Sequence, residues 1–236
     1  MKNVRIVLLQ TYHPGNIGAA ARAMMNMGIR DLVLVRPRRF PDEAATSRAG
    51  TANVILEQAR VAPDLHSAIA DCGWVIGTSA RGREFSLPQG TPKEYAPRII
   101  SEAQNHPVAI VFGRERMGLS NEDIMQCHAH MMIPSHPDHP VLNIAQAIQV
   151  ICYEIYQSEL DQNTHPNRIE AYPNHETLER FYRELENSLL ESGFINAEHP
   201  GRTMDRLRTL FKRGRPTQKE LQTLFGALKS LTQDRQ

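Results

Sequence analysis

The sequence predicts an α/β protein: a parallel sheet covered by helices over residues 1–160, followed by a small all-helical module. Short apolar or β-branched runs alternate with helical patterns as far as residue 157, and this alternation is typical of a parallel sheet with helices on its faces. Beyond residue 173 the strand pattern disappears and helical periodicity remains. With 236 residues and 41% apolar content, the chain can bury a large core plus an appended unit.

The elements of the sheet domain follow in order along the chain. The expected strands are Val4–Leu9, Leu32–Val35, Trp74–Gly77, Val108–Phe112 and Met131–Ile133. The expected helices between and after them are Ile17–Met27, Asp64–Ala70, Pro92–Ala103, Asn121–Gln126 and Leu142–Gln157. On the last helix an apolar stripe points to the core, and Val150 and Tyr153 lie off it. Two interpretations of this helix remain open: it buries a second face against another subunit, or it is simply a core helix of a large domain.

The C-terminal part reads as a helical module over residues 174–236, joined by a polar linker at 161–173. Leu178 to Leu189 mark a helix that Gly193 can terminate, and Met204 to Phe211 mark a second helix ended by Gly214. Thr217 and Glu220 have the spacing of a capping box that opens a last helix.

Charge is unevenly distributed although the formal net charge is only +1. Residues 155–200 hold three basic and nine acidic residues, whereas residues 201–236 hold nine basic and three acidic residues. A strongly basic end predicts a polyanionic partner. The three cysteines show no CxxC spacing. No apolar run approaches the length of a membrane span, and Arg5 interrupts the apolar run near the N-terminus. We expect a cytoplasmic protein without a membrane partner.

Several chemistries are disfavoured by missing motifs. The chain has no G-x-G-x-x-G after a strand, no P-loop and no G-x-S-x-G elbow, which argues against a dehydrogenase, an NTPase and an α/β-hydrolase. The cysteine and histidines between Cys127 and His139 crowd together, but no pair has a structural zinc spacing and three prolines fragment the stretch. We expect polar loop histidines and no metal requirement.

Three predicted strands end in glycine-bearing or polar loops: 74–80, 108–120 and 131–134. In open α/β sheets the carboxyl ends of strands line the ligand crevice, and glycines there let a ligand approach the backbone. The alternative for Gly113 and Gly118 is a plain turn. Three such loops, together with the segment NIGAAAR at residues 16–22, favour a ligand site.

NIGAAAR, FGRERMGLS at 112–120 and VLNIAQA at 141–147 resemble, in order and spacing, the three motifs of the SPOUT RNA methyltransferases. The resemblance extends over nearly the whole chain, and it points to the tRNA enzymes that methylate the ribose 2′-hydroxyl of cytidine or uridine at position 32 of the anticodon loop. It implies a C-terminal trefoil knot in the α/β domain, a homodimer, and S-adenosyl-L-methionine as cofactor. The residues that it implies for the loops around the cofactor are Thr78, Ser79, Ala80, Gly113, Ile133, Pro140, Val141 and Leu142.

The resemblance also implies catalytic roles for Arg22 and Asn143. In the family the counterpart of Arg22 is often described as a general base. Because the pKa of a guanidinium is high, we favour Arg22 as an orienting group that stabilises the developing alkoxide, although the sequence does not decide between the two roles. Family members commonly have serine where this chain has Val141, which puts any role of that hydroxyl in doubt here.

RNA contacts are expected at both ends of the chain. Asn16 is read as the N-cap of its helix, with the amides of Ile17, Gly18 and Ala19 forming an anion site. Gly18 then has no side chain that would block a phosphate or ribose, and the side chain of Arg22, one turn later, lies over this part of the helix surface. The other expected RNA-binding residues are Arg114, Arg202, Arg206, Arg208, Lys212 and Arg213. On the tail helix we expect Leu207, Leu210 and Phe211 to face inward.

Two other classes of function compete with a methyltransferase. A non-catalytic RNA-binding protein would keep the basic tail and need no cofactor crevice. An oxidoreductase would need a dinucleotide fingerprint, which the chain lacks.

Overall fold

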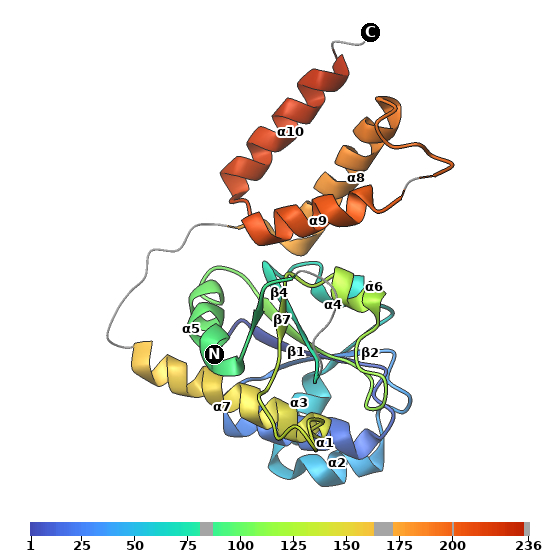
Figure 1. Cartoon of the computed structure of the whole chain (residues 1–236). Helices are drawn as coiled ribbons and strands as arrows, with labels where there is room; N and C mark the ends of the chain where they lie inside the picture. The colour runs from blue at the N-terminus through green and yellow to red at the C-terminus, as the bar shows by residue number, and fades with distance from the viewer. Residues whose placement is uncertain (81–86, 163–171, 200, 234–236) are drawn as a thin grey trace. The chain divides into compact units, whose positions relative to one another are not determined.

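The computed structural model describes residues 1–80, 87–162, 172–199 and 201–233. The chain divides into two compact units, residues 1–169 and residues 170–236, and Figure 1 shows the elements of each. None of the helices in the described ranges has the length and apolar content that a membrane span requires.

The first unit is built on a seven-stranded sheet in the order β3-β2-β1-β6-β4-β7-β5, and the strands of every pair are parallel. The strands are β1 Val4–Leu9, β2 Asp31–Val35, β3 Arg60–Ala62, β4 Trp74–Thr78, β5 Gln89–Gly90, β6 Val108–Phe112 and β7 Ala129–Met131. The register aligns Ile6 of β1 with Leu32 on one side and Ile110 on the other. The expected α/β class and parallel sheet are therefore confirmed.

Strand predictions were wrong at the edges of the sheet. The short strands β3 and β5 were missed, because three and two residues show no apolar alternation. The last predicted strand, Met131–Ile133, lies two residues too late. The ladder runs through Ala129–Met131, where Met131 aligns with Thr78 of β4, and the chain leaves the sheet before Pro134.

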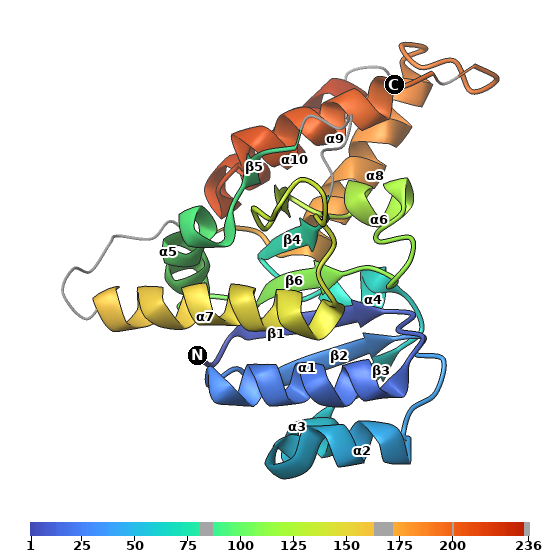
Figure 2. The ribbon, with the colours of Figure 1, turned by 60° about the horizontal axis from the view of Figure 1, so that its bottom comes forward.

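Helices cover both faces of this sheet. One face packs against α1 Pro14–Asn26, α2 Glu43–Ala49, α3 Asn53–Gln58, α5 Pro92–Glu102 and α7 Ile144–Gln162. The other face packs against α4 Leu65–Ile69 and α6 Asn121–Met125. Figure 2 shows α1 and α7 on the same side of the sheet. The helix α7 continues five residues beyond its predicted end at Gln157 and includes the first two residues of the predicted linker.

Gly18 of α1 has a packing role. It is buried, and a Cβ added there would lie 2.0 Å from the carbonyl oxygen of Ala45 in α2. The glycine therefore lets two helices approach closely. The prediction that Gly18 clears a surface for phosphate or ribose is wrong, because α2, which the sequence reading missed, occupies that surface.

The second unit contains three helices, α8 His175–Glu191, α9 Thr203–Gly214 and α10 Gln218–Gln233. Phe181 lies at the centre of its core, with ring centroids 4.9 Å from Phe211 and 5.4 Å from Phe225. The predicted capping box is confirmed, since the amide of Thr217 donates to the Glu220 carboxylate at 2.7 Å.

Two details of α9 differ from the prediction. The left-handed residue that ends the helix is Arg215, with φ of 46°, and Gly214 is still helical. Leu210, which we expected to face inward, is 52% exposed, whereas Phe211 packs against the core. The termination of α8 is as predicted, because Gly193 follows it with φ of 75°.

Candidate active site

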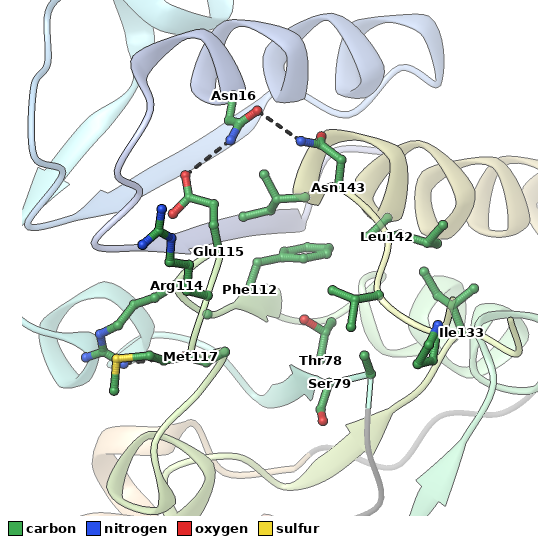
Figure 3. Close-up of a pocket in the computed structure, with 18 of the residues that line it drawn as sticks. Asn16, Thr78, Ser79, Phe112, Arg114, Glu115, Met117, Ile133, Leu142 and Asn143 are labelled. Carbon is green, nitrogen blue, oxygen red and sulfur yellow. Dashed lines mark hydrogen bonds between the residues drawn. The ribbon is translucent and has the colours of Figure 1, made fainter. Parts of the chain in front are cut away.

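A cavity of about 760 Å³ opens where β4, β6 and β7 end and α7 begins (Figure 3). Its volume lies in the range of small-molecule sites. The residues that line it are Asn16, Thr78, Ser79, Ala80, Phe112, Gly113, Arg114, Glu115, Arg116, Met117, Gly118, Met131, Ile133, Pro140, Val141, Leu142, Asn143, Ile144, Ala147 and Ile151. The structure therefore brings together all eight residues expected in cofactor loops, from four separate segments of the chain.

Hydrogen bonds connect the end of β4 to β6 and to β7 at the cavity. The Thr78 hydroxyl donates to the carbonyl of Val111 at 3.0 Å, and the amide of Ser79 donates to the carbonyl of Met131 at 3.2 Å. These bonds fix the backbone of the first predicted cofactor loop between its two neighbouring strands.

The glycines of the second loop serve its internal packing. A Cβ on Gly113 would lie 2.1 Å from the backbone of Gly118, and Gly118 itself has a left-handed φ of 66°. The loop closes on itself through an isolated bridge between Arg114 and Gly118. The turn interpretation of both glycines thus accounts for them, although Gly113 also lines the cavity.

The α1 helix begins earlier than expected. Its N-cap is His13, whose side chain accepts a hydrogen bond from the amide of Gly15, so the prediction of Asn16 as N-cap is wrong. Asn16 is the third helical residue, and the amides of Ile17 and its neighbours lie inside the helix. A histidine cap followed by proline gives a weaker sequence pattern than an asparagine before an alanine run, which explains the misplacement.

Glu115 binds the backbone donors just before α1, and not the amides of Ile17, Gly18 and Ala19 where an anion was expected. Its carboxylate accepts from the amides of Tyr12 at 3.0 Å and His13 at 3.2 Å, and from the side-chain amide of Asn16 at 3.2 Å. Burial alone would raise the pKa of Glu115, but these hydrogen bonds lower it below its ordinary value. The backbone donors that precede α1 therefore hold an ionised side chain of the protein itself.

A chain of amide groups links α1 to α7 across the cavity rim (Figure 3). The oxygen of Asn16 accepts from the side-chain amide of Asn143 at 3.2 Å, while the oxygen of Asn143 accepts from the amide of Ala145 at 2.9 Å. Each end of this chain thus has a fixed orientation: Glu115 orients Asn16, and the first turn of α7 orients Asn143.

Arg114 is engaged within the protein. Its guanidinium donates to the Asp123 carboxylate at 2.9 Å and to the side chain of Gln10. Burial would raise the pKa of Asp123, but bonds from the Ser120 amide and hydroxyl and from Arg114 lower it. Arg114 therefore holds the second loop in shape, while it also lines the cavity, and its contact with RNA stays a prediction.

The third loop is held by a hydroxyl that sequence reasoning missed. Ser135 donates toward the carbonyls of Pro140 at 2.9 Å and Ile133 at 3.3 Å, joining the two sides of the loop that walls the cavity. Val141, which replaces the expected serine, lines the cavity with its side chain 60% exposed. A serine between prolines and histidines gave no signal by itself.

Arg22 lies apart from this cavity. It is exposed on α1 and does not line the cavity of its own chain, and neither does Gly18. Of the residues expected to meet RNA in the first unit, Asn16 alone combines a cavity position with a side chain directed to Asn143.

The histidine cluster has local partners. The Nδ1 of His128 accepts from the amide of Val75 at 2.9 Å, and His136 lies 3.7 Å from Asp138. Within the ranges described, no three His, Cys, Asp or Glu side chains converge as they would around a metal ion.

The basic residues of α9 divide into two groups. Arg208 forms two hydrogen bonds with Glu179, at 2.7 and 2.8 Å, and lies 4.5 Å from the ring of Tyr182, so it belongs to the packing of its unit. Lys212 is buried, with 5% exposure. Lys212 therefore does not lie on the surface of α9, and Arg208 is half-buried with its charge paired to Glu179; an RNA contact by either residue stays a prediction. The residues of the predicted RNA-binding set that are exposed here are Arg202, Arg206 and Arg213.

Known proteins resemble the chain over its full length. It is 44% identical to the tRNA (cytidine/uridine-2′-O-)-methyltransferase TrmJ of Escherichia coli strain K12, over 99% of this chain and 96% of the relative. The crystal structure of TrmJ from Z. mobilis superimposes with a TM-score of 0.83 at 34% identity, covering 97% of this chain and 98% of that one. A probable methylase family protein from Haemophilus influenzae has a TM-score of 0.66 at 38% identity, covering 99% and 97%.

Family models account for both units. Residues 3–153 match the SpoU rRNA Methylase family, and residues 176–236 match the C-terminal domain of the tRNA methyltransferase TrmJ. The chain therefore belongs to the SpoU methylase family and carries a TrmJ-type C-terminal domain.

Proposed function

We propose that the protein transfers a methyl group from S-adenosyl-L-methionine to the ribose 2′-hydroxyl of cytidine or uridine in tRNA, at position 32 of the anticodon loop. The observation that carries this proposal is the cavity itself. Four segments of the chain, between residues 78 and 147, meet there, and the linked amides of Asn16 and Asn143 lie at its rim. The Escherichia coli relative, which matches 99% of this chain, is named as a tRNA (cytidine/uridine-2′-O-)-methyltransferase.

The cavity suits the cofactor chemically. Phe112, Ile133 and Leu142 offer apolar surface for an adenine ring, and the exposed Val141 extends that surface at the mouth. Backbone groups at Thr78–Ala80 and Gly113 are fixed nearby to meet polar parts of the molecule. The ionised Glu115 on the wall complements a cation such as a sulfonium.

The residues of the chain act chiefly by positioning, and the bound cofactor supplies the methyl group. In-line placement of the attacking oxygen can contribute several kcal/mol to catalysis. Asn143 and Asn16 present oriented amide groups where the ribose would lie. Arg22 stabilises the alkoxide that develops on the 2′-oxygen, and the hydroxyl proton passes to phosphate or water.

Arg22 reaches the reacting sugar from a second copy of the chain in this proposal. The α7 helix carries a row of exposed apolar side chains, Tyr153 at 48%, Tyr156 at 36% and Leu160 at 51%. A symmetric pairing of two such faces would bury them and bring α1 of one subunit to the cavity of its partner. The free, buried cysteines of the chain fit a reducing cytoplasm, where we place the enzyme.

The activity is tested with purified protein, S-adenosyl-L-methionine and unmodified tRNA. Nuclease digestion and mass spectrometry should find 2′-O-methylcytidine or 2′-O-methyluridine at position 32. A tRNA with a 2′-deoxy nucleotide at position 32 is the matched control and should accept no methyl group. Methylation at another position, such as 34, would correct the site. Tight tRNA binding without any transfer would favour a non-catalytic RNA-binding protein.

The shared site is tested by mixing two inactive variants, Arg22→Ala and Asn143→Ala. If Arg22 acts across the subunit interface, each mixed dimer has one intact site, and random pairing restores about a quarter of the wild-type activity. If both residues act within one chain, every site carries a defect and the mixture stays inactive. Light scattering establishes that the variants remain dimers.

A further inference from the structure

The segment between β2 and α2 carries three exposed arginines, Arg36, Arg38 and Arg39. Within the described residues, no carboxylate lies within 4.0 Å of any of their guanidinium nitrogens. The nearby acids are otherwise engaged: Asp42 caps α2, and Asp64 caps α4 and feels Arg36 only as a distant charge. The segment therefore presents positive charge to its surroundings without internal neutralisation.

The backbone of this segment is fixed against the loop that follows β1. The amide of Arg38 donates to the carbonyl of Thr11 at 3.2 Å, and the amide of Arg36 donates to the carbonyl of Ala62 at 3.2 Å. Arg36 also has a left-handed φ of 46°, a conformation that glycine or asparagine adopts more easily. A charged side chain is thus carried on a rigid backbone at some conformational cost.

Arg38 lies over an exposed aromatic ring. Its guanidinium carbon is 4.0 Å from the centroid of Tyr12, and Tyr12 remains 60% exposed. The amide of Tyr12 donates to Glu115, which lines the cavity. Tyr12 therefore connects the stacked pair directly to a residue of the cavity wall, and the pair follows the carboxyl ends of β1 at Leu9 and β2 at Val35.

We propose that Tyr12, Arg36, Arg38 and Arg39 form an RNA-binding surface, which we term the basic loop surface, for the single-stranded nucleotides beside the reacting ribose. The proposal rests on the function proposed above and names where the α/β unit grips its substrate. Planar guanidinium groups bind phosphates with paired hydrogen bonds, and an exposed tyrosine stacks on unpaired bases. This combination of charge and stacking favours single-stranded RNA over an acidic protein, which needs no aromatic platform.

The basic loop surface is tested by tRNA binding as a function of salt, using full-length protein. Arg38→Ala/Arg39→Ala should make the slope of log affinity against log salt shallower by about 1.4, since each contact with a single-strand phosphate contributes about 0.7. The matched control is Lys2→Ala/Arg30→Ala, which removes two exposed charges near the opposite edge of the sheet. Its slope should equal that of the wild type.

Stacking is tested at Tyr12. Tyr12→Ala should weaken tRNA binding by about 5-fold to 150-fold, the range for loss of one stacked base, whereas Tyr12→Phe should bind as the wild type does. Calorimetric affinity for S-adenosylhomocysteine should be the same in all these variants, which shows that the cavity is intact. Arg38→Lys should keep the salt slope and lose affinity, because lysine carries the charge without the planar group.

The outcomes separate this surface from the proposed function. If the wild type methylates tRNA and the Arg38/Arg39 variant has the wild-type salt slope, the basic loop surface is wrong and the function stands. Equal loss of slope in the Lys2/Arg30 control would likewise overturn it, because the effect would then be one of net charge. If the wild type transfers no methyl group to tRNA, the proposed function fails whatever the variants bind.

Discussion

Replacing Gly18 by alanine distinguishes sharply between packing and ligand binding as the reason for this glycine. On helix propensity alone, alanine in the middle of α1 should stabilise the protein by about 1 kcal/mol. The structure predicts the opposite. The new Cβ would lie 2.0 Å from the carbonyl oxygen of Ala45 and 2.8 Å from its carbonyl carbon.

The magnitude follows from how far α2 must move. Carbon atoms pack at about 3.5 to 4.0 Å, so the two helices must separate by more than about 1 Å at this contact. Ala45 and Ala49 of α2 are fully buried, whereas the outer face of α2 is exposed, so the helix can move away only by opening this buried contact. Overpacking costs about 1 to 3 kcal/mol, and a contact this short with backbone atoms places the cost at about 2 to 3 kcal/mol, which outweighs the gain in propensity.

Thermal and urea unfolding of the full chain measure the effect. We expect a net loss of about 1 to 2 kcal/mol, which lowers the Tm of the α/β unit by about 2 to 8 °C. Gly15→Ala in the same helix is the control, because its Cβ would meet side-chain atoms of His13 at 3.0 Å and no backbone of another helix. A Gly18→Ala protein that is as stable as the wild type but binds tRNA weakly would refute the packing argument.

Three further predictions concern the loops and the tail. Arg114→Ala removes the cation that Asp123 bonds and should lower the free energy of unfolding by about 1 to 3 kcal/mol in urea titrations, while the exposed neighbour Arg116→Ala should change it by less than about 0.5 kcal/mol. Glu115→Gln should lose the stability that comes from the lowered carboxyl pKa of Glu115 in the folded protein. This contribution is complete above pH 4.5 and disappears as the pH falls through the folded-state pKa. Unfolding curves of wild type and variant should therefore differ at pH 7 and converge in acid. Arg208→Ala should destabilise the helical unit by about 1 to 2 kcal/mol, whereas Arg206→Ala should leave its melting unchanged and weaken tRNA binding in a salt titration; equal stability loss in both would contradict the assignment.

The central part of the fold could be predicted because its residues carry strong local patterns. The strands β1 and β6 are runs of five or six apolar or β-branched residues, apart from Arg5, and the stripe of Ile148, Ile151 and Ile155 marks α7. The edge strands β3 and β5 have too few residues to show a period, and α2 buries only two alanines, so its sequence shows no apolar stripe. The trefoil knot stays a prediction of the family resemblance.

The site was predictable as a set of loops and less so as a set of contacts. All eight expected cofactor positions line the cavity, because parallel strands place their carboxyl ends together. The partners of Glu115, Arg114 and Gly18 lie far away in sequence and became visible only in the folded chain. Gly18 and Arg114 were interpreted from their own segments and Glu115 was not singled out, although each of the three has a partner in a different segment.

Hydrogen–deuterium exchange with and without S-adenosylhomocysteine tests most directly that the cavity is the cofactor site. Slower exchange is predicted in four segments of the α/β unit, 78–80, 113–118, 131–133 and 140–147, because the ligand would cover and rigidify them. Residues 172–233 of the helical unit and the distant strand β3 should exchange as in the free protein. Protection confined to other segments, or no binding at all, would contradict the assignment of this cavity.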